Sequence, residues 1–301
     1  MDLRIFFALI CLLPTPSLWA KRLALTFDDS PRLASPLLGV EKRAQKIRDV
    51  LREAGVKEVL FLATPAEFTP KTKDLLAGHG KAGHLIGNHT HSHESANEID
   101  PKAFIADVKA AHEFLKDIPG FTPFFRFPFL REGSPRATKD ELSEFLKRFG
   151  YRRAYVTIDT SEWLIEEQLH RALAQKKKVD YEKLKRIYLD TLVNSIEFYD
   201  DLATATFKRE VKHTLLLHEN ELAGLFLADL IVELRRKGWE LVSPTDAYSD
   251  PLAELEPKTL LLNQGRVMAL AIDRGYTGPQ RSGAENREEL LEKIRKEKVF
   301  F

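Results

Sequence analysis

The sequence RLALTFDD, residues 22–29, joins a short apolar run to two adjacent carboxylates, and variants of this pattern recur along the chain. A continuous apolar run of this length is typical of a strand buried on both faces, as in parallel sheets. The next segment, Val40–Ala54, has apolar residues at steps of three and four and stops before Gly55, which predicts a helix. Strand-like and helix-like segments then alternate as far as Val242, an order that indicates parallel βαβ units.

About seven segments between Lys21 and Val242 are predicted as strands. They are Arg22–Phe27, Val56–Ala63, His84–Gly87, Phe124–Phe127, Tyr151–Ile158, Thr214–Leu217 and Trp239–Val242. The helices predicted between them are Val40–Ala54, Lys71–Gly78, Pro101–Leu115, Thr138–Phe149 and Glu221–Lys237. We therefore predict an α/β fold, a distorted (β/α) barrel with about seven parallel strands. In such a barrel the chemistry lies at the carboxyl ends of the strands, where the polar clusters described below fall.

Two segments exceed a minimal barrel. The mostly helical stretch Trp163–Phe207 predicts a helical insertion over about residues 164–210, roughly twice as long as a crossover needs. Residues 251–301 form a C-terminal extension with one more strand-like run, Arg266–Ile272, and a charged helix, Asn286–Lys298. We therefore divide the chain into a main domain over residues 21–250, which contains the insertion, and this extension.

Residues 1–20 have the pattern of a secretory signal peptide. Arg4 precedes the apolar run Ile5–Leu13, prolines follow, and Trp19-Ala20 offers a cleavage point. The run is shorter than the roughly 20 residues that span a bilayer, so we expect no stable membrane anchor. A buried first strand or an uncleaved anchor is the alternative. We expect an exported protein that is periplasmic, secreted or associated with the cell wall.

Composition narrows the classes of function. The 301 residues carry a net charge of +1, which gives no field that favours nucleic acid, and no nucleic-acid partner is expected. Hydrophobic residues at 44% and charged residues at 30% are typical of a soluble globular protein. Cys11, the single cysteine, lies in the predicted signal peptide, so the mature chain has no disulfide. Any metal site must therefore use His, Asp or Glu. The sequence does not indicate an oligomeric state.

The densest cluster of metal-ligand types is GNHTHSH, residues 87–93. On a helical turn, His89 and His93 would share a face and could grip one metal ion. On a strand, all three histidines would share a face instead. Periodicity does not choose between these arrangements, but three histidines in five residues indicate a metal site.

Asp28 and Asp29 follow the first predicted strand. Adjacent carboxylates repel, so one of them needs a cation or hydrogen bonds. With two histidines, Asp29 would complete a two-His, one-carboxylate set that leaves positions open for water. Asp28 could then take a proton from that water. A helix cap or a solvated Asp-Asp-Ser-Pro turn is the alternative.

Three further polar residues follow predicted strands. Arg126 stands among aromatic residues, where burial would require a carboxylate partner, whereas a surface arginine is the alternative. Asp159 begins the sequence DTSEW, which is equally consistent with a helix N-cap that places Glu162 in the first turn. His218 follows the apolar run Leu215–Leu217 and suits acid–base work, although a satisfied core histidine is equally consistent with the pattern.

These five clusters, in this order, resemble the polysaccharide deacetylases with the NodB-homology domain, carbohydrate esterase family 4. The family pattern runs T-F-D-D, H-[S/T]-x-x-H, R-x-P-[Y/F], D-x-x-x-W and L-x-H. This chain has Thr26-Phe27-Asp28-Asp29, His89-Thr90-x-x-His93, Arg126-x-Pro128-Phe129, Asp159-x-x-x-Trp163 and Leu216-x-His218. Each motif is short, but five in order at strand ends are specific. The resemblance covers roughly residues 23–242 and implies a distorted (β/α) barrel.

The resemblance implies a metal centre with a base beside it. Asp29, His89 and His93 would bind one divalent metal ion, for which zinc is expected. Asp28 would be the general base. Arg126 would pair with Asp28 and hold it ionised, because a nearby cation lowers the pKa of a carboxylate.

The resemblance also implies an acid and a pocket. The backbone N–H of Phe129 would help to stabilise the oxyanion. His218 would be the general acid, and Asp159 would keep it protonated. Trp163 and Leu216 would form the walls of the acetyl pocket.

Four positions depart from the family pattern or stand outside it. Ser30 replaces the usual glycine, Phe129 the usual tyrosine and Glu219 the common aspartate. None of these changes removes a group that the mechanism needs, because the oxyanion donor is a main-chain group. His91 is not a family ligand, and we interpret it as a variable position.

The implied activity is metal-dependent hydrolysis of N-acetyl groups on an amino-sugar polymer, with release of acetate. The first choice of substrate is N-acetylglucosamine in the peptidoglycan glycan strand, followed by chitin or chito-oligosaccharide and then by acetylated xylan. One rival is a carbohydrate-binding protein on the same fold, which predicts loss of an essential group. The other is a purely structural metal site, which would be closed and four-coordinate.

Overall fold

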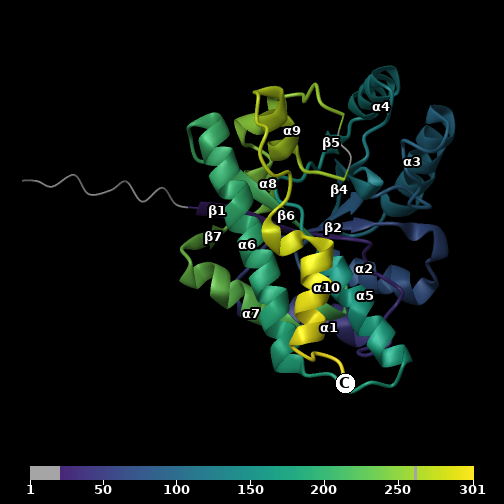
Figure 1. Cartoon of the computed structure of the whole chain (residues 1–301). Helices are drawn as coiled ribbons and strands as arrows, with labels where there is room; N and C mark the ends of the chain where they lie inside the picture. Colours follow the sequence, from purple (N-terminus) through teal and green to yellow (C-terminus); the bar gives the residue numbers. More distant parts are fainter. Residues whose placement is uncertain (1–20, 261–262) are drawn as a thin grey trace, which may run out of the picture.

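A single parallel sheet organises the protein (Figure 1). The computed structural model describes residues 21–260 and 263–301. In sheet order the strands are β5 (Arg152–Arg153), β4 (Phe121–Phe125), β3 (Leu85–Asn88), β2 (Leu60–Ala63), β1 (Lys21–Asp28) and β6 (Lys212–His218), and β7 (Trp239–Leu241) also pairs with β1. Every pairing between these strands is parallel. The predicted α/β fold with about seven parallel strands is therefore confirmed.

The sheet curls because β1 is shared unequally between its neighbours. Its residues 22–28 pair with β6, whereas β7 pairs with the beginning of its other edge and β2 with the end. On the far side, the predicted strand Tyr151–Ile158 is regular only at β5, but Ile158 makes a parallel bridge to Leu215 of β6. This bridge joins the two ends of the sheet, as expected of a distorted barrel.

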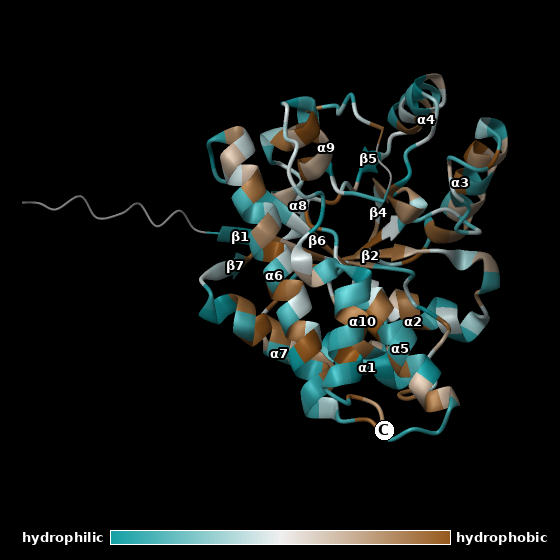
Figure 2. Ribbon diagram, in the orientation of Figure 1, coloured by the Kyte–Doolittle hydropathy of each residue, from teal (hydrophilic) through white to brown (hydrophobic). Residues whose placement is uncertain are grey.

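Amphipathic helices cover the sheet as the apolar spacing predicts. These helices are α1 (Val40–Glu53), α2 (Pro70–Lys81), α3 (Pro101–Leu115), α4 (Arg136–Arg148) and α7 (Glu221–Arg236). In α3, Pro101 occupies the first turn, Asp100 caps the helix by accepting from the Lys102 N–H, and Phe104 and Val108 lie on the buried face. Figure 2 shows the contrast between the uniformly apolar β2 and the two-faced helices around it.

The predicted helical insertion consists of α5 (Glu162–Ala174) and the long α6 (Tyr181–Phe207). The chain after Pro251 contains η3 (Pro251–Glu254), α9 (Arg266–Asp273), η4 (Gly283–Glu285) and α10 (Arg287–Lys296), and it is preceded by α8 (Pro244–Ala247). Figure 1 shows α9 and α10 against α6, and ion pairs such as Lys293–Asp190 join α10 to that helix.

The prediction of a strand at Arg266–Ile272 is wrong, because this segment is the helix α9. A short apolar run does not by itself distinguish a strand from a buried helix. Here six consecutive residues, 266–271, are buried, so other parts of the protein cover α9 around most of its surface. The division into domains stays a prediction, and the predicted signal peptide lies outside the described residues. Among the helices of the described ranges, none is long and apolar enough to cross a membrane.

Candidate active site

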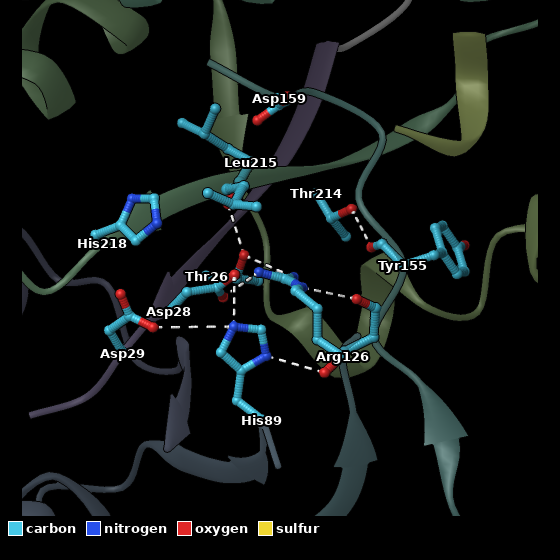
Figure 3. A network of polar contacts seen from close by, with 12 residues as sticks. Thr26, Asp28, Asp29, His89, Arg126, Tyr155, Asp159, Thr214, Leu215 and His218 are labelled. Carbon is cyan, nitrogen blue, oxygen red and sulfur yellow. Dashed lines mark hydrogen bonds and ion pairs between the residues drawn. The ribbon is translucent and has the colours of Figure 1, made fainter. Parts of the chain in front are cut away.

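Polar side chains collect where the parallel strands end (Figure 3). Asp28 is the last residue of β1 and its Cα pairs with that of His218, the last residue of β6. His89 directly follows β3 and Arg126 directly follows β4. Register alone therefore brings these four side chains to one end of the barrel, where parallel-barrel chemistry is expected.

Asp29, His89 and His93 form a possible metal site, with one ligand atom from each residue all within 4.8 Å of one another. Oδ1 of Asp29 lies 3.4 Å from Nε2 of His93 and 4.0 Å from Nε2 of His89. One carboxylate and two imidazoles suit a divalent ion such as zinc, and three protein ligands leave a coordination position open. Of the residues described, His91 does not belong to this group.

The histidine segment adopts neither the helix nor the strand that periodicity had left open. Thr90 and His93 have left-handed backbone angles, with φ of 67° and 62°. Asn88 accepts a hydrogen bond from the Thr90 N–H, and the Thr90 hydroxyl oxygen accepts one from the His93 N–H. These local bonds turn the chain so that His89 and His93 converge from a loop.

His89 is held in the form that a metal ligand requires. Its Nδ1 lies 2.9 Å from the carbonyl oxygen of Arg126, which can only accept, so Nδ1 carries the proton and Nε2 is the free ligand atom. Burial lowers the pKa of His89 to about 4, so the ring is neutral near pH 7. Burial would raise the pKa of Asp29, but the nearby His218, His93 and His89 lower it.

Arg126 and Asp28 form a buried ion pair, which confirms the predicted carboxylate partner of Arg126. Nη1 of Arg126 donates to Oδ1 of Asp28 at 2.5 Å. The same guanidinium donates to the Ala154 carbonyl at 2.9 Å, the Thr26 hydroxyl at 2.9 Å and the Tyr248 hydroxyl at 3.2 Å. Arg126 is therefore fixed on several sides. Because Oδ1 of Asp28 accepts from Arg126, Oδ2 is the oxygen of Asp28 that this arginine does not bind.

His218 has a different carboxylate partner from the one expected. Its Nδ1 lies 2.7 Å from Oε1 of Glu162, and the same oxygen accepts from the backbone N–H of His218 at 2.9 Å. Asp159 instead accepts from Nη1 of Arg281 at 3.3 Å. Burial opposes the charge on His218, but Glu162, together with Asp29 and Asp28, raises its pKa to about 9. The expectation that Asp159 serves His218 is thus replaced by a direct bond to Glu162.

A cavity of about 490 Å³ joins these groups, within the usual range of small-ligand sites. Nine of the ten site residues predicted from the sequence line it, and the tenth, Arg126, lies buried beside it. The cavity lining comprises Asp28, Asp29, Arg32, His89, His93, Phe129, Leu130, Asp159, Trp163, Leu216, His218, Asn263 and Arg281.

Two aromatic rings stand at the cavity with much of their surface exposed. Phe129 is 50% exposed and Trp163 is 42% exposed, which gives the cavity apolar walls open to a ligand. The φ of Phe129 is 57°, and its backbone N–H has no hydrogen-bond partner among the residues described. That N–H is thus free to donate, as an oxyanion donor must be.

Sequence reasoning missed Arg32, Asn263, Arg281 and the role of Glu162 at the cavity. Glu162 stood inside a quoted cluster, but its position in the first turn of α5 was explained by a helix start. Arg281 lies 122 residues from Asp159, in a segment without a motif, so no local signal pointed to it.

Comparison with known proteins relates part of the chain to one family. Residues 17–154, somewhat less than half of the chain, match the family model of the polysaccharide deacetylases. A peptidoglycan-N-acetylglucosamine deacetylase of Bacillus cereus is 32% identical over 107 residues, which are 35% of this chain. The match also spans only 35% of that relative.

Solved structures share the fold. The peptidoglycan deacetylase PdaC of Bacillus subtilis is 18% identical with a TM-score of 0.51, over 76% of this chain and 91% of that one. The peptidoglycan N-acetylglucosamine deacetylase Bc1960, in complex with a hydroxamate-type benzamide, is 20% identical with a TM-score of 0.52, over 76% and 88%. At these identities the likeness concerns the fold alone.

Proposed function

We propose that this protein hydrolyses N-acetyl groups on an amino-sugar polymer and releases acetate. The observation that carries the proposal is the convergence of a possible metal site, a paired carboxylate and a charged histidine on one cavity. The polymer that we favour is the peptidoglycan glycan strand, with N-acetylglucosamine as the unit that loses its acetyl group. The name of the Bacillus cereus relative supports this choice.

Asp29, His89 and His93 would hold a divalent cation, for which zinc suits the ligand set best. Such an ion, when bound, polarises a carbonyl group and makes a water molecule more acidic. The free Nε2 of His89 and the open coordination position both support a catalytic rather than a closed structural site.

Asp28 acts as the general base. Its Oδ1 is occupied by Arg126, so Oδ2, which lies 3.6 Å from Nε2 of His89, takes the proton of the attacking water. The free N–H of Phe129 donates to the oxyanion that forms as the water oxygen bonds to the acetyl carbon.

His218 acts as the general acid. Its Nδ1 is bonded to Glu162, so Nε2 is the nitrogen that delivers a proton to the amide nitrogen as the carbon–nitrogen bond breaks. An amide nitrogen is a poor leaving group unless it is protonated, and a pKa of about 9 keeps His218 charged near pH 7. The products are acetate and a free amine on the sugar. Trp163 and Leu216 would form the walls of the pocket around the acetyl group.

The test is acetate release from purified peptidoglycan, chito-oligosaccharide and acetylated xylan, followed by identification of the sugar that gains an amine. We expect most acetate from peptidoglycan, with new amines on glucosamine. Most acetate from chito-oligosaccharide would change the polymer, and most acetate from xylan would make the protein an esterase. Binding of glycan without any acetate would favour a carbohydrate-binding protein instead.

Metal removal tests the alternative that the metal site is purely structural. A catalytic site should lose acetate release on chelation while the fold persists, whereas a structural site should unfold. We also propose, from the pattern of residues 1–20, that the protein is exported to the periplasm or cell wall. Fractionation of cells that express the full chain would test this location.

A further inference from the structure

A buried hydrogen bond joins the residues that follow Asp29 and His218 in the chain. The hydroxyl of Ser30 donates to Oε2 of Glu219, although 189 positions separate the two residues. Both residues are fully buried, and neither lines the cavity. Ser30 directly follows Asp29, and Glu219 directly follows His218, the last residue of β6. The bond therefore ties the chain beyond β1 to the chain beyond β6.

We propose that Ser30 and Glu219 are positioning residues of Asp29, and that their hydrogen bond holds the Asp29 carboxylate where it can bind a metal ion together with His89 and His93. This inference rests on the proposed function, in which those three side chains form the metal centre. It gives a role to two buried residues that take no part in the proposed chemistry.

The backbone of Asp29 needs support from its surroundings. Its φ of 58° lies in the left-handed region, which is unfavourable for a residue with a side chain and persists where the surrounding structure enforces it. The strand β1 ends at Asp28, so its ladder does not supply this support. Ser30 does, because its N–H donates to the Leu62 carbonyl of β2 at 3.0 Å and its hydroxyl donates to Glu219. The direction of the Asp29 side chain thus depends on a neighbour fixed at two points.

Glu219 is a fixed and charged acceptor. Its backbone N–H donates to the Asp28 carbonyl at 3.1 Å, which continues the pairing of β1 with β6. Its Oε2 also lies 3.2 Å from Nε2 of His79, whose ring stacks on Phe61 of β2. Burial would raise the pKa of Glu219, but the nearby His79 lowers it. A hydrogen bond to a charged carboxylate is stronger than one between neutral groups, so the bond from Ser30 is a firm anchor.

Other contacts of the same loop lie further from Asp29. Arg32 donates to Glu166 at 2.6 Å, and the hydroxyl of Ser35 donates to Oε1 of Glu221 at 3.0 Å. These bonds hold the loop that leads to α1, three and six positions beyond Asp29. The bond from the residue adjacent to Asp29 should therefore have the largest effect on the position of its carboxylate.

The experiment is a double-mutant cycle in the full-length protein, with Ser30→Ala, Glu219→Met and the double variant. Equilibrium dialysis measures the dissociation constant of zinc for the folded protein, and urea unfolding of the metal-free protein measures stability separately. Each single substitution removes the hydrogen bond. Any through-space effect of losing the Glu219 charge is the same with and without the Ser30 hydroxyl, so the cycle isolates the bond.

Ser35→Ala is the matched control. It removes the same group from the same loop, and that group is also bonded to a buried glutamate, Glu221. We expect this control to keep the wild-type zinc affinity, whatever its effect on stability. A general loosening of the loop would instead weaken zinc binding in Ser35→Ala as much as in Ser30→Ala.

We expect each single variant to bind zinc about tenfold more weakly than wild type, which is typical when a group that orients a metal ligand is lost. The double variant should bind zinc about as weakly as Glu219→Met alone, because the same bond is lost only once. Wild-type zinc affinity in either single variant, losses that multiply in the double variant, or an equal loss in Ser35→Ala would overturn the proposal.

The remaining outcomes also decide. If Glu219→Met does not fold, a loss of zinc affinity confined to Ser30→Ala supports the proposal, and wild-type affinity in Ser30→Ala contradicts it. A wild-type chain that binds zinc but releases no acetate from any polymer would overturn the proposed function, while the cycle still decides whether Ser30 and Glu219 position Asp29. A wild-type chain without zinc affinity would overturn both.

Discussion

Nη1 of Arg126 donates to Oδ1 of Asp28 at 2.5 Å, although the two residues are 98 positions apart in the chain. Their side chains are 1% and 4% exposed, so the pair is desolvated and each charge depends on the other. The bond also selects the Asp28 oxygen that remains free to act. Two predictions follow from this pair, one for catalysis and one for stability.

Replacing Asp28 by Asn should slow acetate release by roughly two to four powers of ten, because an amide cannot take a proton from water. The variant keeps the shape of the side chain, so circular dichroism should be unchanged. Asp74→Asn, at an exposed position on α2, is the matched control and should retain full activity. Normal acetate release by Asp28→Asn would remove Asp28 from its role as base.

Removing Arg126 should destabilise the fold. Arg126→Met leaves the Asp28 carboxylate buried without a partner, which costs about 3–5 kcal/mol. Adding Asp28→Asn removes that charge and should restore part of the loss. Urea unfolding of both single variants and the double variant measures the coupling, and strictly additive changes would contradict the pairing.

His84 offers a prediction about acid stability away from the active site. It is buried against Phe61, and burial lowers its pKa to about 4 from 6.5. As pH falls below 6.5 the unfolded chain binds a proton first, so stability present above pH 6.5 is lost progressively down to about pH 4. Over that window metal-free wild type should lose roughly 3 kcal/mol more than His84→Leu. Parallel pH curves of unfolding free energy for the two proteins would refute the prediction.

Arg281 connects the C-terminal segment to the cavity and to Asp159. Arg281→Met removes a polar wall residue and leaves the buried Asp159 without its cation, so we expect the KM for the polymer to rise about tenfold. Steady-state kinetics measure this. Arg274→Met is the control, because Arg274 bonds the Thr206 carbonyl outside the cavity and should keep the wild-type KM. An unchanged KM in Arg281→Met would show that the C-terminal segment does not contribute to substrate binding through Arg281.

The barrel and most of the site could be predicted from the sequence, because both depend on local patterns. Apolar runs located the strands, and parallel register then brings Asp28, His89 and His218 to one edge. The cost of burying an arginine among aromatic residues predicted a carboxylate partner for Arg126, and the resemblance to a known family implied that this partner is Asp28.

The remaining features depend on tertiary contacts that no local pattern reports. The α9 segment is apolar enough to suit either a strand or a helix, and packing against α6 decides for the helix. Glu162 and Asp159 are three residues apart, and only the direction in which α5 starts decides which of them contacts His218. Arg281 reaches the cavity through the fold of the C-terminal segment.

Zinc binding by equilibrium dialysis tests most directly whether Asp29, His89 and His93 form one metal centre. We predict one zinc ion per wild-type chain, strongly weakened binding in His93→Ala and Asp29→Asn, and retained binding in His91→Ala, the neighbouring histidine outside the group. A wild-type chain without zinc affinity, or equal losses in His91→Ala and His93→Ala, would contradict the account.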